Sequence, residues 1–158
     1  MAGDAEKTMK TWAKIIESYQ EIPDHFKDTF QTLPVNRGGF PYTVLTSSTT
    51  QGFFYKEKPK LVCSFDHKLY IIEEIKGGVS CTCFPVKDIN YVEMGSILLR
   101  SWIRINGITS NGLKSSMFTF NTVTSKHFKP IIEALRTNTN NSTNADLETE
   151  RNKFNYLN

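Results

Sequence analysis

Cysteine is the residue type in this chain with the widest chemical repertoire, because a thiolate can bind a metal or act as a nucleophile. Cys81 and Cys83 alternate along one apolar run, so on a strand their thiols share a face, and Cys63 lies in a neighbouring run. Structural zinc normally needs four ligands, often as cysteine pairs on turns. Because free cysteine is also a common buried hydrophobe, we expect no metal and no cofactor.

Catalysis by a cysteine or by paired carboxylates finds little support in the pattern. A nucleophilic cysteine needs a basic partner and an orienting group nearby, and no spacing ties a histidine to a cysteine. Glu73 and Glu74 adjoin, so on a strand they face opposite sides. We therefore expect a protein that is not an enzyme. Its scattered histidines are His25, His67 and His127.

The first candidate for binding is a tryptophan flanked by two arginines. Arg100, Trp102 and Arg104 share one face if this segment is a strand. Aromatic area and guanidinium groups are typical anchors of protein interfaces, so these residues form a candidate interaction face. The alternative, which we favour, is that Trp102 is covered by an N-terminal helix whose apolar stripe needs a platform. That stripe contains Trp12, Ile16 and Tyr19.

The second candidate for binding is a group of three lysines. Lys56, Lys58 and Lys60 project together in an extended chain and could contact phosphates or anionic lipid headgroups. Glu57 weakens this group, and a solvated loop kept soluble by lysine is the favoured alternative. The net charge of +3 does not indicate nucleic acid. The positive excess lies in residues 94–136, which carry six basic groups and one acidic group.

Composition and length set the class of protein. The 158 residues, with 39% hydrophobic and 22% charged, are typical of one globular domain with extensions. Three cysteines form no disulfide framework, and no apolar run approaches the roughly 18 residues that span a bilayer. The start has no secretory signal pattern. We expect a cytoplasmic protein without a transmembrane segment and with no nucleic-acid partner.

The N-terminal third is predicted to be helical. An apolar stripe of period 3.6 predicts a helix over Ala5–Glu21, ended by Pro23. Asp24 can cap a second short helix, on which Phe26, Phe30 and Leu33 share a face. Helices this short are marginal alone, so both are expected to pack on the sheet that follows.

From Phe40 onward the pattern changes to short apolar runs separated by turn residues, which predicts an antiparallel sandwich or barrel. The turns are expected at Asp66-His67-Lys68, Lys76-Gly77-Gly78, Asn106-Gly107 and Asn111-Gly112. The strands are expected at Tyr42–Thr46, Gly52–Tyr55, Lys60–Phe65, Leu69–Ile75, Val79–Phe84, Ile89–Met94, Leu98–Asn106 and Ser115–Asn121.

The period returns to helical over Val123–Arg136, with Thr124 or Ser125 as a cap. Pro130 is awkward inside a helix, so either the helix begins near it or a separate turn at Ser125–Phe128 leads into it. Residues 137–158 form an Asn-rich polar segment that is expected to be a disordered tail.

The segment from Phe84 to Glu93, read as Phe-Pro-Val-Lys-Asp-Ile-Asn-Tyr-Val-Glu, ends one strand, makes a polar step and opens the next. After it come Gly95, the strand Leu98–Asn106, the strand Met117-Phe118-Thr119-Phe120 and the helix Ser125–Arg136. In this order, Gly52 to Arg136 resembles the bacterial pleckstrin-homology-like domains, over about half the chain. The resemblance implies a small barrel of curved sheets, closed at one end by an amphipathic C-terminal helix, and used as a scaffold for binding.

The predicted protein is therefore mainly β, with a pleckstrin-homology-like antiparallel barrel over residues 40–136. Residues 1–39 are predicted to be an N-terminal helical extension packed on it. The leading function is a non-enzymatic protein-interaction or scaffold module, with a protein partner or self-association. The alternative is a peripheral binder of anionic lipid headgroups. Lipid sites are not carried over from the resemblance, because the basic first hairpin of eukaryotic relatives is only faintly present in Lys56, Lys58 and Lys60.

Overall fold

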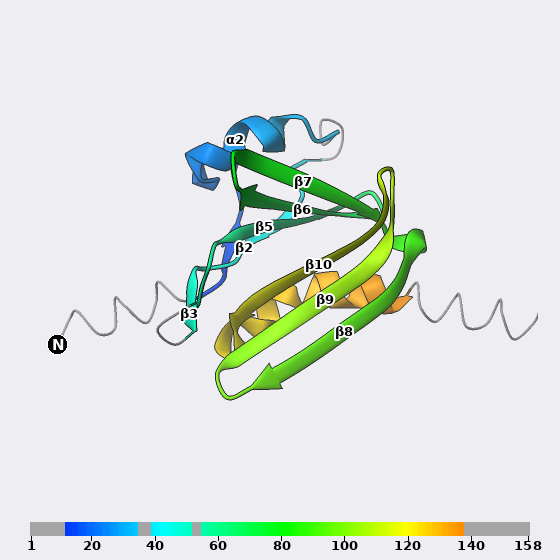
Figure 1. Cartoon of the computed structure of the whole chain (residues 1–158). Coiled ribbons are helices and arrows are strands. Elements are labelled where there is room, and N and C mark those ends of the chain that lie inside the picture. Colours follow the sequence, from blue (N-terminus) through cyan, green and yellow to red (C-terminus); the bar gives the residue numbers. More distant parts are fainter. Residues whose placement is uncertain (1–11, 35–38, 52–54, 138–158) are drawn as a thin grey trace, which may run out of the picture.

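The computed structural model describes residues 12–34, 39–51 and 55–137, and it consists mainly of antiparallel strands in two sheets (Figure 1). A five-stranded sheet has the order β1 (Lys14–Ile16), β2 (Tyr42–Leu45), β5 (Lys60–Phe65), β6 (Lys68–Ile75), β7 (Gly78–Pro85). A three-stranded sheet has the order β10 (Gly112–Asn121), β9 (Arg100–Thr109), β8 (Ile89–Ile97), and a short ribbon pairs β3 (Thr49–Gln51) with β4 (Tyr55–Glu57). The predicted mainly-β class is confirmed.

The main core fills the space between the two sheets and beneath the C-terminal helix. It takes apolar side chains from both sheets and from the helix, because alternate residues of each strand face inward. A stacked aromatic pair, Phe120 and Phe128, has ring centroids 4.1 Å apart and joins the last strand to the segment after it. Ile131 and Leu135 of the C-terminal helix are buried in this core, so the predicted C-terminal helix is present and packs on the sheets.

A second core lies on the outer face of the five-stranded sheet, under α2 (Asp24–Gln31). Phe26, Phe30 and Leu33 are buried here and share a face, as predicted. The helix packs against β6 and β7 and lies above them in Figure 1. Asp24 does not cap the helix through its side chain. It occupies the first helical position and pairs with Lys27 at 2.7 Å.

The predicted helix over Ala5–Glu21 is wrong in the part that the structure describes, and residues 1–11 lie outside that part. Lys14–Ile16 forms β1, which pairs antiparallel with β2, and Tyr19–Glu21 is a single 3-10 turn. Two adjacent β-branched residues, Ile15 and Ile16, favour the strand. The open edge of the sheet then overrides the helical spacing of the apolar residues.

The turn assignments hold at three of the four predicted positions. Asn106-Gly107 is the exception, because both residues lie inside β9. A Cβ at Gly107 would lie 3.0 Å from the Asp88 carbonyl oxygen and 3.1 Å from Phe84 Cδ1. Glycine is therefore needed here for close approach of the chain from β7 and β8, and it does not form a turn.

The strand predicted to begin at Leu98 begins two residues later. Leu98 and Leu99 form the two-residue turn that joins β8 to β9, and Leu98 has a φ of 54°. The predicted strand Gly52–Tyr55 also differs, since β4 begins at Tyr55 and residues 52–54 lie outside the described chain. The other expected strands are present with small shifts at their ends.

The segment after β10 combines the two alternatives left open for Pro130. Thr122–Phe128 is a 3-10 helix, and residues 129–137 continue it as an α-helix with Pro130 in the first turn. Asn121, not Thr124 or Ser125, supplies the cap, because its side-chain oxygen accepts the Val123 N–H at 3.0 Å. The predicted tail lies outside the described residues from position 138 onward. No helix of the described chain is long and apolar enough to cross a membrane.

Candidate functional site

An apolar groove runs between β8 and the C-terminal helix. Its floor is built from Val92 and Met94 of β8 and from Ile132 and Leu135 of the helix, and its volume is about 310 Å³. Met94 is 42% exposed, although the residue opposite it on β9, Ile103, is fully buried. The groove exists because β8 is the last strand of its sheet and the helix does not cover its inner face completely.

β8 offers a backbone edge beside this groove. Its inner neighbour is β9, and no strand among the described residues pairs with its other side. Unpaired amide and carbonyl groups along such an edge are a template for another extended chain. The groove and the edge together can therefore hold an extended segment, with alternate side chains pointing into the groove.

The predicted interaction face lies on the opposite side of the same sheet. Arg100, Trp102 and Arg104 point outward from β9, as their alternation with buried residues predicts. Trp102 is half-buried, and in the described residues Ile16 and Tyr19 of the predicted covering stripe lie in the core under α2, so the favoured alternative is wrong for these residues. A Cβ at Gly95 would lie 2.1 Å from Trp102 Cζ2, so the indole lies flat on this glycine of β8.

The N-terminal apolar residues go elsewhere. Ile16 is buried in the core under α2, with Tyr19 packed against it, on the far sheet from Trp102. Trp12 is 37% exposed. The strand β1 places Ile16 opposite Thr43 of β2, so Ile16 cannot cover the second sheet.

The two arginines of the predicted face are held by carboxylates. Arg104 Nη1 lies 3.4 Å from the Glu93 carboxylate on β8, and Arg100 Nη2 lies 3.7 Å from the Glu57 carboxylate on β4. Thr119 donates a hydrogen bond to the same Glu57 carboxylate. This polar junction ties the ribbon of β3 and β4 to the second sheet. The Arg104–Glu93 pair is exposed, and exposed pairs contribute little to stability, so Arg104 can exchange partners at modest cost. The Glu57 carboxylate is mostly buried, so its pair with Arg100 is held more firmly.

The predicted lysine group is divided between partners. Lys58 pairs with Glu74 at 3.0 Å, and Lys60 pairs with Glu73 at 3.1 Å and donates to the Met117 carbonyl. Lys56 lies on β4, and its side chain is outside the described atoms. Lys58 and Lys60 line one cavity of about 370 Å³, but the carboxylates of Glu57, Glu73 and Glu74 line it as well and lower its positive charge.

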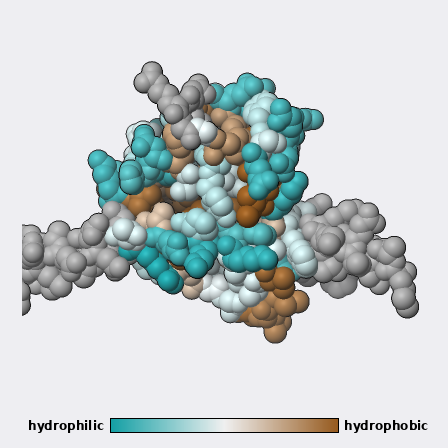
Figure 2. All heavy atoms as spheres, turned by 180° about the vertical axis from the view of Figure 1, so that it is seen from behind, coloured by the Kyte–Doolittle hydropathy of each residue, from teal (hydrophilic) through white to brown (hydrophobic). Residues whose placement is uncertain are grey.

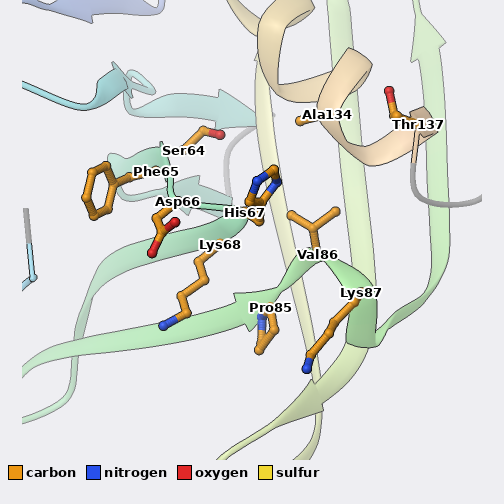
Figure 3. A pocket seen from close by; sticks show the side chains of 10 residues that line it. All are labelled: Ser64, Phe65, Asp66, His67, Lys68, Pro85, Val86, Lys87, Ala134 and Thr137. Carbon is orange, nitrogen blue, oxygen red and sulfur yellow. The ribbon is translucent and has the colours of Figure 1, made fainter. Parts of the chain in front are cut away.

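A cavity of about 790 Å³ lies between the β5–β6 turn, the end of β7 with the residues after it, and the C-terminal helix. Figure 3 shows that its basic side chains diverge: His67 points toward the helix, while Lys68 and Lys87 point away from it. Asp66 and His67 have φ of 50° and 54°, and the His67 carbonyl accepts the Val86 N–H at 2.9 Å. The wall is thus a fixed turn rather than a convergent set of catalytic groups.

The cysteines behave as core and strand residues. Cys63 is buried, and burial raises the pKa of its thiol to about 12, which disfavours the reactive thiolate. Cys81 and Cys83 share a face of β7, as predicted, and register places Cys63 and Cys83 on either side of Tyr70. Among the described residues, no three His, Cys, Asp or Glu side chains form a group that could hold a metal ion.

Two surfaces are not predicted from the sequence: the groove along β8 and the apolar turn between β8 and β9. Ile97, Leu98 and Leu99 are 66%, 92% and 68% exposed. The signal was the run of three aliphatic residues directly before Arg100, which breaks the alternation expected for a half-buried strand. An apolar run normally predicts a buried strand, so a turn at its centre could not be assigned.

The comparisons with known proteins leave the assignment to the geometry: no family model, no curated protein and no solved structure matches this chain.

Proposed function

We propose that this protein is a non-enzymatic interaction module, built on a pleckstrin-homology-like barrel, that binds an extended segment of a partner protein along β8. The order of the elements supports the barrel: a meander ending in β5, β6 and β7 is followed by the meander β8, β9 and β10 and then by the C-terminal helix. The free thiols fit a reducing cytoplasm, the compartment that we propose for it.

The observation that carries the proposal is the juxtaposition of an open strand edge with an apolar groove. Main-chain hydrogen bonds to β8 would supply affinity that does not depend on sequence, and the groove would select apolar side chains at alternate positions. A groove of about 310 Å³ is at the lower end of the range for ligand sites, which suits one or two side chains.

The outer face of the sheet, which contains Trp102, would contact the remaining side chains of such a segment. A strand added beside β8 presents alternate residues to the groove and to the face that contains Gly95 and Trp102. Trp102 and Arg104 lie within one strand of that edge, so the predicted interaction face becomes the second wall of the same site. Aromatic and arginine side chains are common anchors at such positions.

The test is a selection of peptides from a displayed random library against the full chain, followed by affinity measurement on substituted proteins. We expect peptides with alternating apolar residues, and Met94→Asp should weaken their binding about tenfold or more, because it places a charge in the groove. Ile75→Asp is the matched control, since Ile75 is similarly exposed (48%) but lies on the other sheet. Equal binding to both variants would reject the groove as the site.

A further inference from the structure

The turn between β8 and β9 projects from the molecule as an apolar tip. Leu98 has the highest exposure of any large apolar side chain in the described chain, and Ile97 and Leu99 flank it. Figure 2 shows this end as a brown cluster that protrudes at the foot of the molecule. Three adjacent aliphatic residues exposed on one projection form a patch that folding alone does not explain.

The backbone at this tip makes the choice of leucine more unusual. Leu98 is the first central residue of a two-residue turn and has a φ of 54°. Hairpin turns with positive φ at this position strongly favour glycine, because a Cβ is strained there. Leucine at this site is not buried and strains the backbone, so it lowers the stability of the folded chain. A residue that is unfavourable for folding at an exposed position points to a role in binding.

Further apolar side chains lie at the same end. The Thr122 N–H donates to the Leu99 carbonyl at 2.8 Å. This bond holds the next residue, Val123, beside the turn, where its side chain is 56% exposed. The Ala13 N–H donates to Thr124 Oγ1 at 3.4 Å, so the exposed Trp12 lies beside this segment as well. Tryptophan is favoured at the boundary between water and the acyl chains of a bilayer.

The charge around the tip is positive. From Met94 to Lys126 the sequence contains no aspartate or glutamate. Arg100 follows the turn directly and is paired with Glu57 at 3.7 Å, while Lys126 is exposed and has no acidic partner among the described residues. An apolar tip with cations behind it complements a surface whose negative headgroups cover an apolar interior.

We propose that the β8–β9 turn inserts into the headgroup and upper acyl region of an anionic lipid bilayer. A second copy is the weaker occupant, because two convex tips bury little area against each other, far below that of a stable dimer. A bilayer deforms around a projecting side chain and needs no matching pocket. This inference goes beyond peptide binding and does not require it, since the groove and the tip are separate parts of β8.

The experiment measures co-sedimentation of the full chain with vesicles of phosphatidylcholine, with and without phosphatidylserine, at low and high salt. We expect binding to the anionic vesicles, reduced by salt. Leu98→Asn keeps a residue that tolerates the turn and should lower the partition coefficient about tenfold. Leu113→Asn is the matched control, because Leu113 is 71% exposed at the other end of the same sheet and should not matter.

Three results would overturn the proposal: no binding to anionic vesicles at low salt, equal loss in both variants, or a dimer in solution that depends on Leu98. The last result would assign the tip to a second copy of the chain. Because Leu98 is almost fully exposed, its replacement should not unfold the protein, and circular dichroism of each variant verifies this. Peptide affinity measured on Leu98→Asn separates this test from that of the groove.

Discussion

The two turns at opposite ends of the second sheet each place one residue at positive φ, but one turn is polar and the other is apolar. The β9–β10 turn places Gly112 at a φ of 96° and saturates itself with polar contacts: Thr109 Oγ1 donates to the Gly112 carbonyl at 2.9 Å and accepts the Asn111 N–H at 3.2 Å. The β8–β9 turn places Leu98 at positive φ and leaves it in water. The residues of the first turn suit its backbone conformation, whereas Leu98 in the second turn destabilises the folded chain without being buried.

This contrast separates the roles of the three strands. β9 lies at the centre, while β8 holds both the groove along its edge and the apolar turn at its end. The β9–β10 turn itself is thus polar and internally hydrogen-bonded, although Ile108 and Leu113 beside it are exposed, whereas the β8–β9 turn is apolar. Substitutions in the two turns should therefore change stability in opposite directions.

The largest expected effect comes from Gly112→Val. A β-branched residue at positive φ is strained, so the free energy of unfolding should fall by about 2 kcal/mol. Urea denaturation followed by circular dichroism measures this loss. An unchanged urea midpoint would show that the β9–β10 turn tolerates a side chain at position 112, and the two turns would then not differ in this requirement.

A smaller loss is expected from Thr122→Val behind the apolar turn. Thr122 Oγ1 lies 2.9 Å from Ser101 Oγ and 3.5 Å from Ser96 Oγ, so the substitution removes hydroxyl contacts to both strands. We expect about 1 kcal/mol of destabilisation, measured by thermal unfolding. Thr109→Val tests the corresponding hydroxyl at the polar end, and a much larger loss at Thr109 would mean that only the polar turn depends on its side chains.

Leu98→Asn should act in the opposite direction. Asparagine tolerates positive φ and prefers water, so the free energy of unfolding should rise by about 0.5–1 kcal/mol. Leu113→Asn, at a strand position of ordinary backbone conformation, should give no gain. If Leu98→Asn instead lowers stability, the leucine contributes to the fold, and the case for a binding role at this tip fails.

The smallest effect concerns pH and His127, in the 3-10 helix that follows β10. Burial and the adjacent Lys126 lower the pKa of His127 below its ordinary 6.5. The unfolded chain therefore binds a proton more readily, and stability falls as the pH drops through and below about 6.5. His127→Gln should flatten that part of the pH profile of unfolding, whereas the polar turn carries no titratable group. An unchanged profile would contradict this assignment.

Much of the sheet structure could be predicted from the sequence, since turn residues such as Asp66-His67 and Asn111-Gly112 mark hairpins whatever surrounds them. What failed depended on contacts across the fold. Asn106-Gly107 has the same local signal but serves close packing, and the stripe through Ile16 gave way to pairing with β2. The outward orientation of Arg100, Trp102 and Arg104 was predicted by alternation alone.

The groove and the tip could not be predicted in the same way. The groove requires the C-terminal helix to lie beside β8, and no local pattern encodes the gap that it leaves over Met94. Leu98 and Leu99 belong to an apolar run that indicates burial, and their exposure follows from the tight turn between Ile97 and Arg100. Both features depend on how distant elements pack and on the register of β8 with β9. A sequence pattern therefore predicts them only when that register is known.

The central claim is that the free edge of β8 receives an extended partner segment. Hydrogen exchange of the full chain with and without a selected peptide tests it most directly, because strand addition pairs amides that otherwise face water. The account predicts slower exchange at outward-facing amides of Ile89–Ile97, with little change in the edge strand β10. Protection that appears on β10, or nowhere on β8 while the peptide is bound, would contradict it.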